Sequence, residues 1–140
     1  MANIVDIAVQ AGSFKTLCAA LEVTGLMDTL RSPGPWTVFA PHDDAFSQLA
    51  AGSLDQLFRD VPRLKEILLY HIVPGQYMAE DVMEQESLST LQGQDIAIRI
   101  LHGVMVNEAA VIETDVEADN GVIHVIDGLI LPRVETGYPL

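Results

Sequence analysis

The chain has 140 residues, of which 49% are hydrophobic, and it carries a formal net charge of −13 at pH 7. This length fits one domain with a sizeable core, and the apolar fraction excludes a disordered, highly charged chain. Residues 76–127 hold eleven acidic residues and one basic residue, Arg99, and this half disfavours nucleic acid and anionic lipid as partners because it repels phosphate.

Three short helices are expected in the first thirty residues. Asn3 is a suitable N-cap for the first, which Gly12 would end. Ser13 is expected to cap the second helix, and Thr24 to begin the third. Cys18 falls on the apolar face of the second helix, so we interpret it as a small core residue in preference to a reactive thiol.

A strand and three more helices are expected next. The strand covers 36–40 and is stopped by Pro41. The helices are predicted to start at Asp43 or its neighbour Asp44, at Ser53 and at Asp60. The last of them is expected to run towards residues 70–71 and to be closed by Pro74 and Gly75.

After a short acidic helix over 80–86, the rest of the chain is predicted to be β. Strands are expected over 88–91, 96–101, 104–106, 111–112, 122–126 and 129–132. The strand over 122–126 has apolar residues on both faces, which is typical of the middle of a sheet. Asn120 and Gly121 before it predict a type I′ turn. Helices followed by strands indicate an α+β fold.

Three stretches, in this order and spacing, resemble the fasciclin domain. Residues 37–46, with the sequence TVFAPHDDAF, resemble the first signature box of that family. Residues 69–75, LYHIVPG, resemble its tyrosine–histidine segment, and residues 120–132 resemble its second box. The resemblance covers residues 3–132, leaves 133–140 as a C-terminal tail, and suggests a single-domain bacterial member. It implies a wedge of about seven strands in a twisted sandwich with short helices packed around it.

The resemblance also implies a function. Fasciclin domains are mostly extracellular adhesion modules, and in animal members the tyrosine–histidine segment and an Asp-Ile pair before the second box are implicated in integrin binding. Tyr70 and His71 match the first element here, and Asp115-Val116 occupies the place of the second, with valine instead of isoleucine. We therefore expect a non-catalytic module that binds a protein or cell-surface partner, without a cofactor, as a monomer or weak homo-oligomer.

The alternative function is an apolar small-molecule carrier. Some members of the family bind carotenoids, and this chain has aliphatic and methionine residues that could line a site for a carotenoid-like or lipid-like molecule. Filling of the core is the preferred interpretation of those residues. A hydrolase is a third possibility, although no nucleophile-elbow, zinc-protease, Cys-x-x-Cys or phosphate-loop pattern is present.

Two histidines and a set of acids could carry chemistry. A structural hydrogen bond is preferred for His71, either to an orphan helix carbonyl or to a carboxylate of the 37–44 corner. His124, in the two-sided apolar strand, is interpreted as a hydrogen-bonded core histidine.

Asp115 alternates with two further acids at 117 and 119, but Asn120 stands where a calcium loop needs glycine, so a solvated strand edge is preferred over a metal site. The adjacent residues 42–44 would not converge on one ion, and we expect no metal.

The cellular compartment follows only weakly from the sequence. No apolar run approaches the length of a membrane span, and residues 1–30 lack a signal-peptide pattern, so the sequence as given predicts a cytoplasmic protein. A leader upstream would instead predict secretion or the cell surface. The single cysteine excludes an internal disulfide framework.

Overall fold

The computed structural model describes residues 3–47, 52–100, 103–107 and 109–130. The helices in these ranges are α1 (Ile4–Ala11), α2 (Lys15–Thr24), α3 (Leu26–Arg31), α4 (Asp43–Ser47), α5 (Ser53–Arg59), α6 (Val61–Leu69) and α7 (Ala79–Met83). The strands are β1 (Trp36–Pro41), β2 (Ile72–Pro74), β3 (Ser87–Ser89), β4 (Asp95–Ile100), β5 (Val104–Val106), β6 (Ala109–Ala118) and β7 (Gly121–Ile126). No helix in the described part of the chain has the length and apolar character needed to cross a membrane.

The strands form one mixed, strongly curved sheet in the order β2-β1-β7-β6-β5-β4-β3. β1 and β7 run parallel, and the other neighbouring pairs are antiparallel. Just beyond β3, the amide of Leu91 donates to the carbonyl of Ile72 in β2 at 2.9 Å, so the two edges of the sheet nearly meet. The predicted α+β class and the wedge of seven strands with short helices are confirmed.

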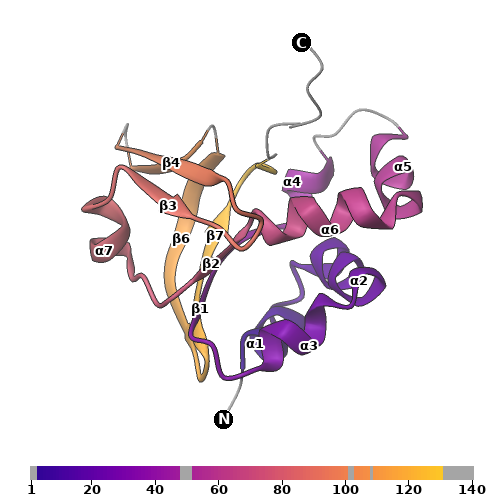
Figure 1. Ribbon diagram of the computed structural model, residues 1–140, viewed down its shortest axis with the longest axis horizontal. Helices are drawn as coiled ribbons and strands as arrows, with labels where there is room; N and C mark the ends of the chain where they lie inside the picture. The colour runs from indigo at the N-terminus through magenta and orange to yellow at the C-terminus, as the bar shows by residue number, and fades with distance from the viewer. Residues whose placement is uncertain (1–2, 48–51, 101–102, 108, 131–140) are drawn as a thin grey trace.

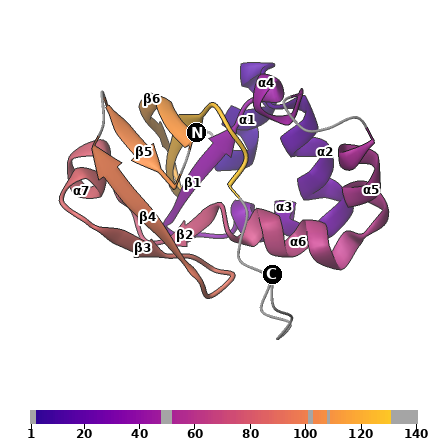
Figure 2. The same cartoon turned by 90° about the horizontal axis from the view of Figure 1, so that it is seen from above.

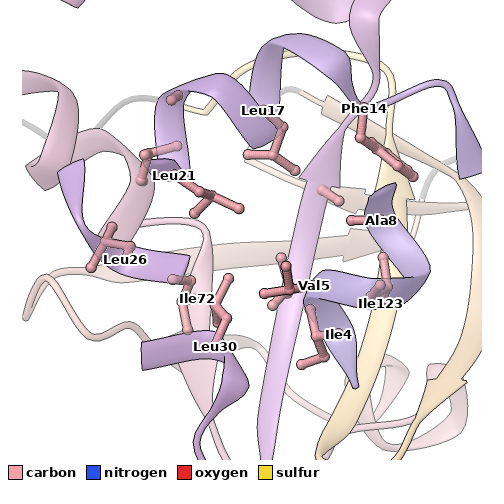
Figure 3. Packing of buried hydrophobic residues seen from close by; sticks show 14 of the residues in the cluster. Ile4, Val5, Ala8, Phe14, Leu17, Leu21, Leu26, Leu30, Ile72 and Ile123 are labelled. Atoms are coloured by element: carbon pink, nitrogen blue, oxygen red, sulfur yellow. The ribbon is translucent and has the colours of Figure 1, made fainter. Parts of the chain in front are cut away.

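The helices divide between the two ends of the molecule. Figures 1 and 2 show α2, α3, α5 and α6 gathered at one end, while α7 stands apart at the other end beside β4. Two hydrophobic clusters match this division. The first lies under the helices and contains Leu17 and Leu30 together with Ile72 of β2 and Ile123 of β7 (Figure 3). The second contains Phe39, Val82 of α7 and residues of β4, β5 and β6.

β7 is the central strand, as its two apolar faces predict. It lies between β1 and β6, and every one of its residues is buried. Ile123 belongs to the first cluster and Ile126 to the second, so the strand is covered on both sides. In β1, Val38 and Phe39 divide between the clusters in the same way.

The turn before β7 differs from the prediction. Ala118 pairs with Gly121, so the loop residues are Asp119 and Asn120, and Asn120 does not have the positive φ that a type I′ turn requires. Gly121 is needed for another reason. A Cβ at this position would lie 1.9 Å from the carbonyl oxygen of Trp36, because β1 passes directly beside it.

Asn120 acts as a buried link between distant segments. Its Oδ1 accepts from the amide of Ile4 at 3.0 Å, at the start of α1. Its Nδ2 donates to the carbonyls of Leu30 and Ser32, at the end of α3. Its own carbonyl accepts from the amide of Trp36 at 2.9 Å, at the start of β1. One side chain thus satisfies backbone groups that the helix ends would otherwise leave unpaired.

Several helix starts were predicted correctly and others were wrong. Asn3 caps α1 and Asp60 caps α6 with their side chains, as expected. Ser13 does not cap α2, because Phe14 occupies the cap position without a side-chain hydrogen bond. Thr24 ends α2 rather than starting α3, and its hydroxyl donates to the carbonyl of Ala20 at 2.8 Å.

The expected cap at Asp43 serves a different helix. Asp43 Oδ1 accepts from the amide of Thr16 at 2.9 Å, in the first turn of α2. The start of α4 is instead capped by His42, whose Nδ1 accepts from the amide of Ala45 at 3.1 Å. The corner after β1 therefore joins two helices, a contact between residues 27 positions apart that local sequence does not reveal.

The strand predictions also need correction at three places. β2 was missed, because its three residues follow a helix directly and are extended only through pairing with β1. The strand predicted over 129–132 is not found at Leu129 and Ile130, which are outside any strand, and residues 131–132 lie beyond the described ranges. β6 is longer than the predicted 111–112. The expected tail over 133–140 also falls outside the described residues.

Candidate functional site

Tyr70 ends α6 and is almost entirely buried, with 4% of its surface exposed. Its hydroxyl donates to the carbonyl of Asp95 at 2.8 Å and accepts from Nδ2 of Asn107 at 2.9 Å. Asn107 lies in the turn between β5 and β6 with a φ of 52°. Tyr70 therefore fastens the end of α6 to the strands of the second cluster.

His71 is also buried, with 1% exposed. Its Nδ1 donates to the carbonyl of Ile67 at 2.7 Å, in the last turn of α6, and this carbonyl also accepts from the amide of Tyr70 at 3.2 Å. Its Nε2 accepts from the amide of Ile130 at 3.2 Å. The predicted structural hydrogen bond to a helix carbonyl is confirmed, and the alternative bond to a carboxylate is not what the ring makes. Burial lowers the pKa of His71 to about 4, although the bond to Ile67 acts in the opposite direction.

Asp115 lies in an irregular part of β6 and is exposed. Its φ of 59° is in the left-handed region, which aspartate tolerates better than most residues. Its Oδ1 accepts from the amide of Ala79 at 2.7 Å, the first residue of α7, so Asp115 caps a helix that lies 36 positions earlier in the chain. Val116 beside it is half-buried, pairs with Ile123 and packs against the first cluster.

His124 connects Asp115 to the segment before α7. Its Nδ1 accepts from the amide of Asp115 at 3.3 Å, and its Nε2 donates to the carbonyl of Tyr77 at 2.7 Å. Thr37 holds the same segment, because its hydroxyl accepts from the amide of Tyr77 at 2.9 Å. The ring of Phe39 lies 5.5 Å from that of His124. The prediction of a hydrogen-bonded core histidine is confirmed.

The two predicted residue pairs serve different parts of the molecule. Tyr70 and His71 hold the end of α6, the turn between β5 and β6, and Ile130. Asp115 and Val116 hold α7 and the first cluster. Sequence reasoning missed Thr37 and Tyr77, because the hydrogen bond from the Tyr77 amide to the Thr37 hydroxyl joins residues 40 positions apart.

A shallow hollow lies between α7 and the sheet, next to Asp115. We call it the α7 hollow; it is lined by Phe39, Ala79, Val82, Val104, Val111, Thr114 and His124. The hollow is partly open to solvent, and it encloses no space that even a water molecule could occupy. It therefore cannot enclose a carotenoid-like molecule, because pockets for small molecules usually enclose roughly 300–1,000 Å³.

The remaining candidates of the sequence behave as ordinary structural residues. Glu117 and Asp119 are exposed and alternate with half-buried Val116 and Ala118, as expected for a solvated strand. Within the ranges that the structure describes, no group of three potential ligands could hold a metal ion. Cys18 is half-buried against the first cluster, and burial, followed by the charge of Asp43, raises the pKa of its thiol. A raised pKa keeps the thiol protonated and unreactive.

Comparison with known proteins gives one consistent result. The sequence model of the fasciclin domain matches residues 12–132. The chain is 46% identical over 131 residues to the uncharacterized protein sll1735 of Synechocystis sp., covering 94% of this chain and 98% of that protein. It is 37% identical over 111 residues to the cell surface glycolipoprotein MPB83 of Mycobacterium bovis, covering 79% of this chain and 49% of that protein. The fold is similar to a FAS1 domain pair from the insect cell adhesion molecule Fasciclin I, with a TM-score of 0.78 at 21% identity, covering 94% of this chain and 51% of that one.

Proposed function

The chain belongs to the fasciclin domain family, and we propose that it is a non-catalytic interaction module that binds a protein or cell-surface partner. One relative, MPB83, is a cell surface protein, and a protein with the same fold, Fasciclin I, is a cell adhesion molecule. Fold alone does not specify function, so the proposal depends on the surface that this chain presents. The observation that carries it is the exposed Asp115, held in a fixed geometry at the position implicated in the family.

The four candidate residues divide into two roles in this proposal. Asp115 is exposed and Val116 is half-buried, so both can contribute surface to a contact. Tyr70 and His71, at 4% and 1% exposed, have almost no surface to offer, and they support binding by holding the strands in place. We expect substitutions at Tyr70 and His71 to lower binding only to the extent that they lower stability.

Two buried histidines, His71 and His124, support the proposal that the chain is not catalytic. In His71 and in His124, one ring nitrogen donates to a carbonyl and the other accepts from an amide. Neither ring therefore has a free nitrogen that could act as a general base. A screen with general esterase substrates, comparing the wild-type protein with His71→Ala, tests the hydrolase alternative. Activity that depends on His71 would contradict the proposal.

Asp115→Asn gives a sharp test of the proposed contact. Asparagine keeps an Oδ1 for the amide of Ala79 and tolerates the left-handed backbone, while the negative charge is lost. Adhesion of native cells to surfaces coated with the purified domain is measured for the wild type and the variant. We expect adhesion strength to fall about threefold, because exposed charge contacts contribute about 0.2–1 kcal/mol each. The melting temperature should stay nearly unchanged.

Glu117→Gln is the matched control, because Glu117 is exposed on the same strand and the net charge changes equally. Asp115→Ala is a second variant, and it should lose about 1 kcal/mol of stability with the helix cap and more through backbone strain. Equal adhesion of all three variants and the wild type would refute the role of Asp115. Loss of adhesion that only follows loss of melting temperature would assign Asp115 to the fold alone.

The carrier alternative is less well supported, because the α7 hollow encloses no space for a small molecule. A visible absorption band in protein purified from its native cells would revive it. The compartment is a separate proposal: the proposed adhesion places the protein at the cell surface, in contrast to the cytoplasmic location expected in the sequence analysis. Fractionation of native cells with an antibody against the domain distinguishes the two.

A further inference from the structure

The α7 hollow continues outwards into exposed apolar side chains. Val82 of α7 is buried in the hollow, and the next residue, Met83, is 51% exposed. Ile100, at the end of β4, pairs in register with Val104 of the hollow and is 53% exposed. Figures 1 and 2 show that α7 is far from the helices at the other end, so this surface is not covered by them. An apolar strip of this kind is a feature of interaction sites.

The charged residues of α7 and β6 are all acidic. Glu80 and Glu84 are exposed on α7 and directly after it, and Glu113 is exposed on β6 beside the hollow residues Val111 and Thr114. In the described part of the chain, the one ion pair is between Arg31 and Asp28 at 3.8 Å, at the helical end. Among the described residues, the carboxylates around the hollow therefore have no cationic partner.

The basic residue nearest in sequence does not change this. Arg99 precedes Ile100 in β4, and side chains alternate between the two faces of a strand. Ile100 pairs with Val104 of the hollow, so Arg99 points to the opposite face of the sheet. Within the ranges that the structure describes, the charged side chains around the apolar strip are therefore acidic. This combination disfavours an anionic lipid surface, and it also disfavours a second copy of this chain, which carries a net charge of −13.

We propose that the α7 hollow is the docking site for a basic peptide segment of a protein partner. One aliphatic side chain of that segment would rest at the rim of the hollow, against the exposed side chains of Met83 and Ile100, and flanking lysine or arginine side chains would meet Glu80, Glu84 and Glu113. The charges supply steering and specificity, and the apolar contact supplies the part of the affinity that salt does not screen. This inference rests on the proposed function and specifies the chemistry of the partner.

The probe is the fluorescein-labelled peptide SKKLKKS, titrated with the intact chain by fluorescence anisotropy. Glu80→Gln combined with Glu84→Gln should weaken binding about fivefold, from two exposed charge contacts. The control combines Glu22→Gln and Glu66→Gln, which are exposed on α2 and α6 and remove the same charge. We expect the control to change binding much less. If both double variants lose the same affinity for the peptide, the peptide is attracted by the net charge of the protein alone, and the proposal is overturned.

Two further comparisons test the apolar contact. Ile100→Ser should weaken binding of SKKLKKS about threefold, whereas Val23→Ser, a similarly exposed position on α2, should leave it unchanged. The peptide SKKSKKS should bind more weakly than SKKLKKS and lose more of its affinity as salt is added. Amide shifts in NMR spectra should concentrate at Val82, Met83 and Val104. Shifts elsewhere, or equal binding of the two peptides, would refute the site.

These outcomes are separable from those of the proposed function. If Asp115→Asn lowers cell adhesion but SKKLKKS binds without preference for the α7 hollow, the interaction module stands and the basic partner is refuted. If SKKLKKS binds at the hollow but native cells do not adhere, the docking site stands on its own and the adhesion function fails.

Discussion

Acid should destabilise this protein through the buried ring of His71. In the folded state its pKa is about 4, against 6.5 for the free side chain, because burial disfavours the charged ring. Protonation would also remove the lone pair on Nε2 that accepts from Ile130. Between about pH 6.5 and about pH 4 the unfolded chain binds a proton here that the folded chain does not.

The sign and size follow from proton linkage. The free energy of unfolding falls as pH falls through this window, with a slope of up to about 1.4 kcal/mol per pH unit. A shift from 6.5 to about 4 corresponds to roughly 3 kcal/mol in total. That contribution is fully present above about pH 6.5 and absent below about pH 4. It is a large part of the roughly 5–15 kcal/mol that stabilises a typical domain.

Urea unfolding at a series of pH values measures the slope, and His71→Asn isolates the contribution of His71. Asparagine can place its Nδ2 near the position of Nδ1 and donate to Ile67, but it does not titrate. The variant will be less stable overall, and its unfolding free energy should depend less steeply on pH than that of the wild type. Equal slopes would refute the reasoning, as would an NMR titration in which the ring of His71 protonates near its ordinary pKa of 6.5.

Two further predictions concern the sheet and its contact with α6. Gly121→Ala should unfold the protein or lower its free energy of unfolding by more than about 3 kcal/mol, because the new Cβ would lie 1.9 Å from the carbonyl oxygen of Trp36. The control is Gly12→Ala, where the space is open, and it should lower the free energy of unfolding by only about 1 kcal/mol. Thermal melting measures both losses. Wild-type stability of Gly121→Ala would contradict the close approach of β1 and β7. Tyr70→Phe should lower the free energy of unfolding by about 1–3 kcal/mol, because the carbonyl of Asp95 and the side-chain Nδ2 of Asn107 both lose the tyrosine hydroxyl as a hydrogen-bond partner. Chemical denaturation measures that loss, and an unchanged midpoint would show that these hydrogen bonds contribute nothing net.

Local patterns in the sequence were sufficient for much of the fold. The strand over 122–126 could be placed in the middle of the sheet because apolar side chains on both faces can be buried only between two layers. The caps at Asn3 and Asp60 were predicted because a capping side chain bonds to amides a few residues away. The order of the three signature stretches also indicated the family, which the comparisons confirm.

The tertiary structure decided the features that depend on distant contacts. β2 exists because β1 supplies its hydrogen bonds, and nothing in Ile72–Pro74 alone indicates a strand. The roles of Asp43 and Asp115 as helix caps join segments 27 and 36 positions apart, and Asn120 ties together elements at both ends of the chain. The sequence by itself determined which residues could be buried, extended or helical. Only the packed chain determined which surface remains open, because exposure and hydrogen-bond partners depend on what the rest of the fold places beside each residue.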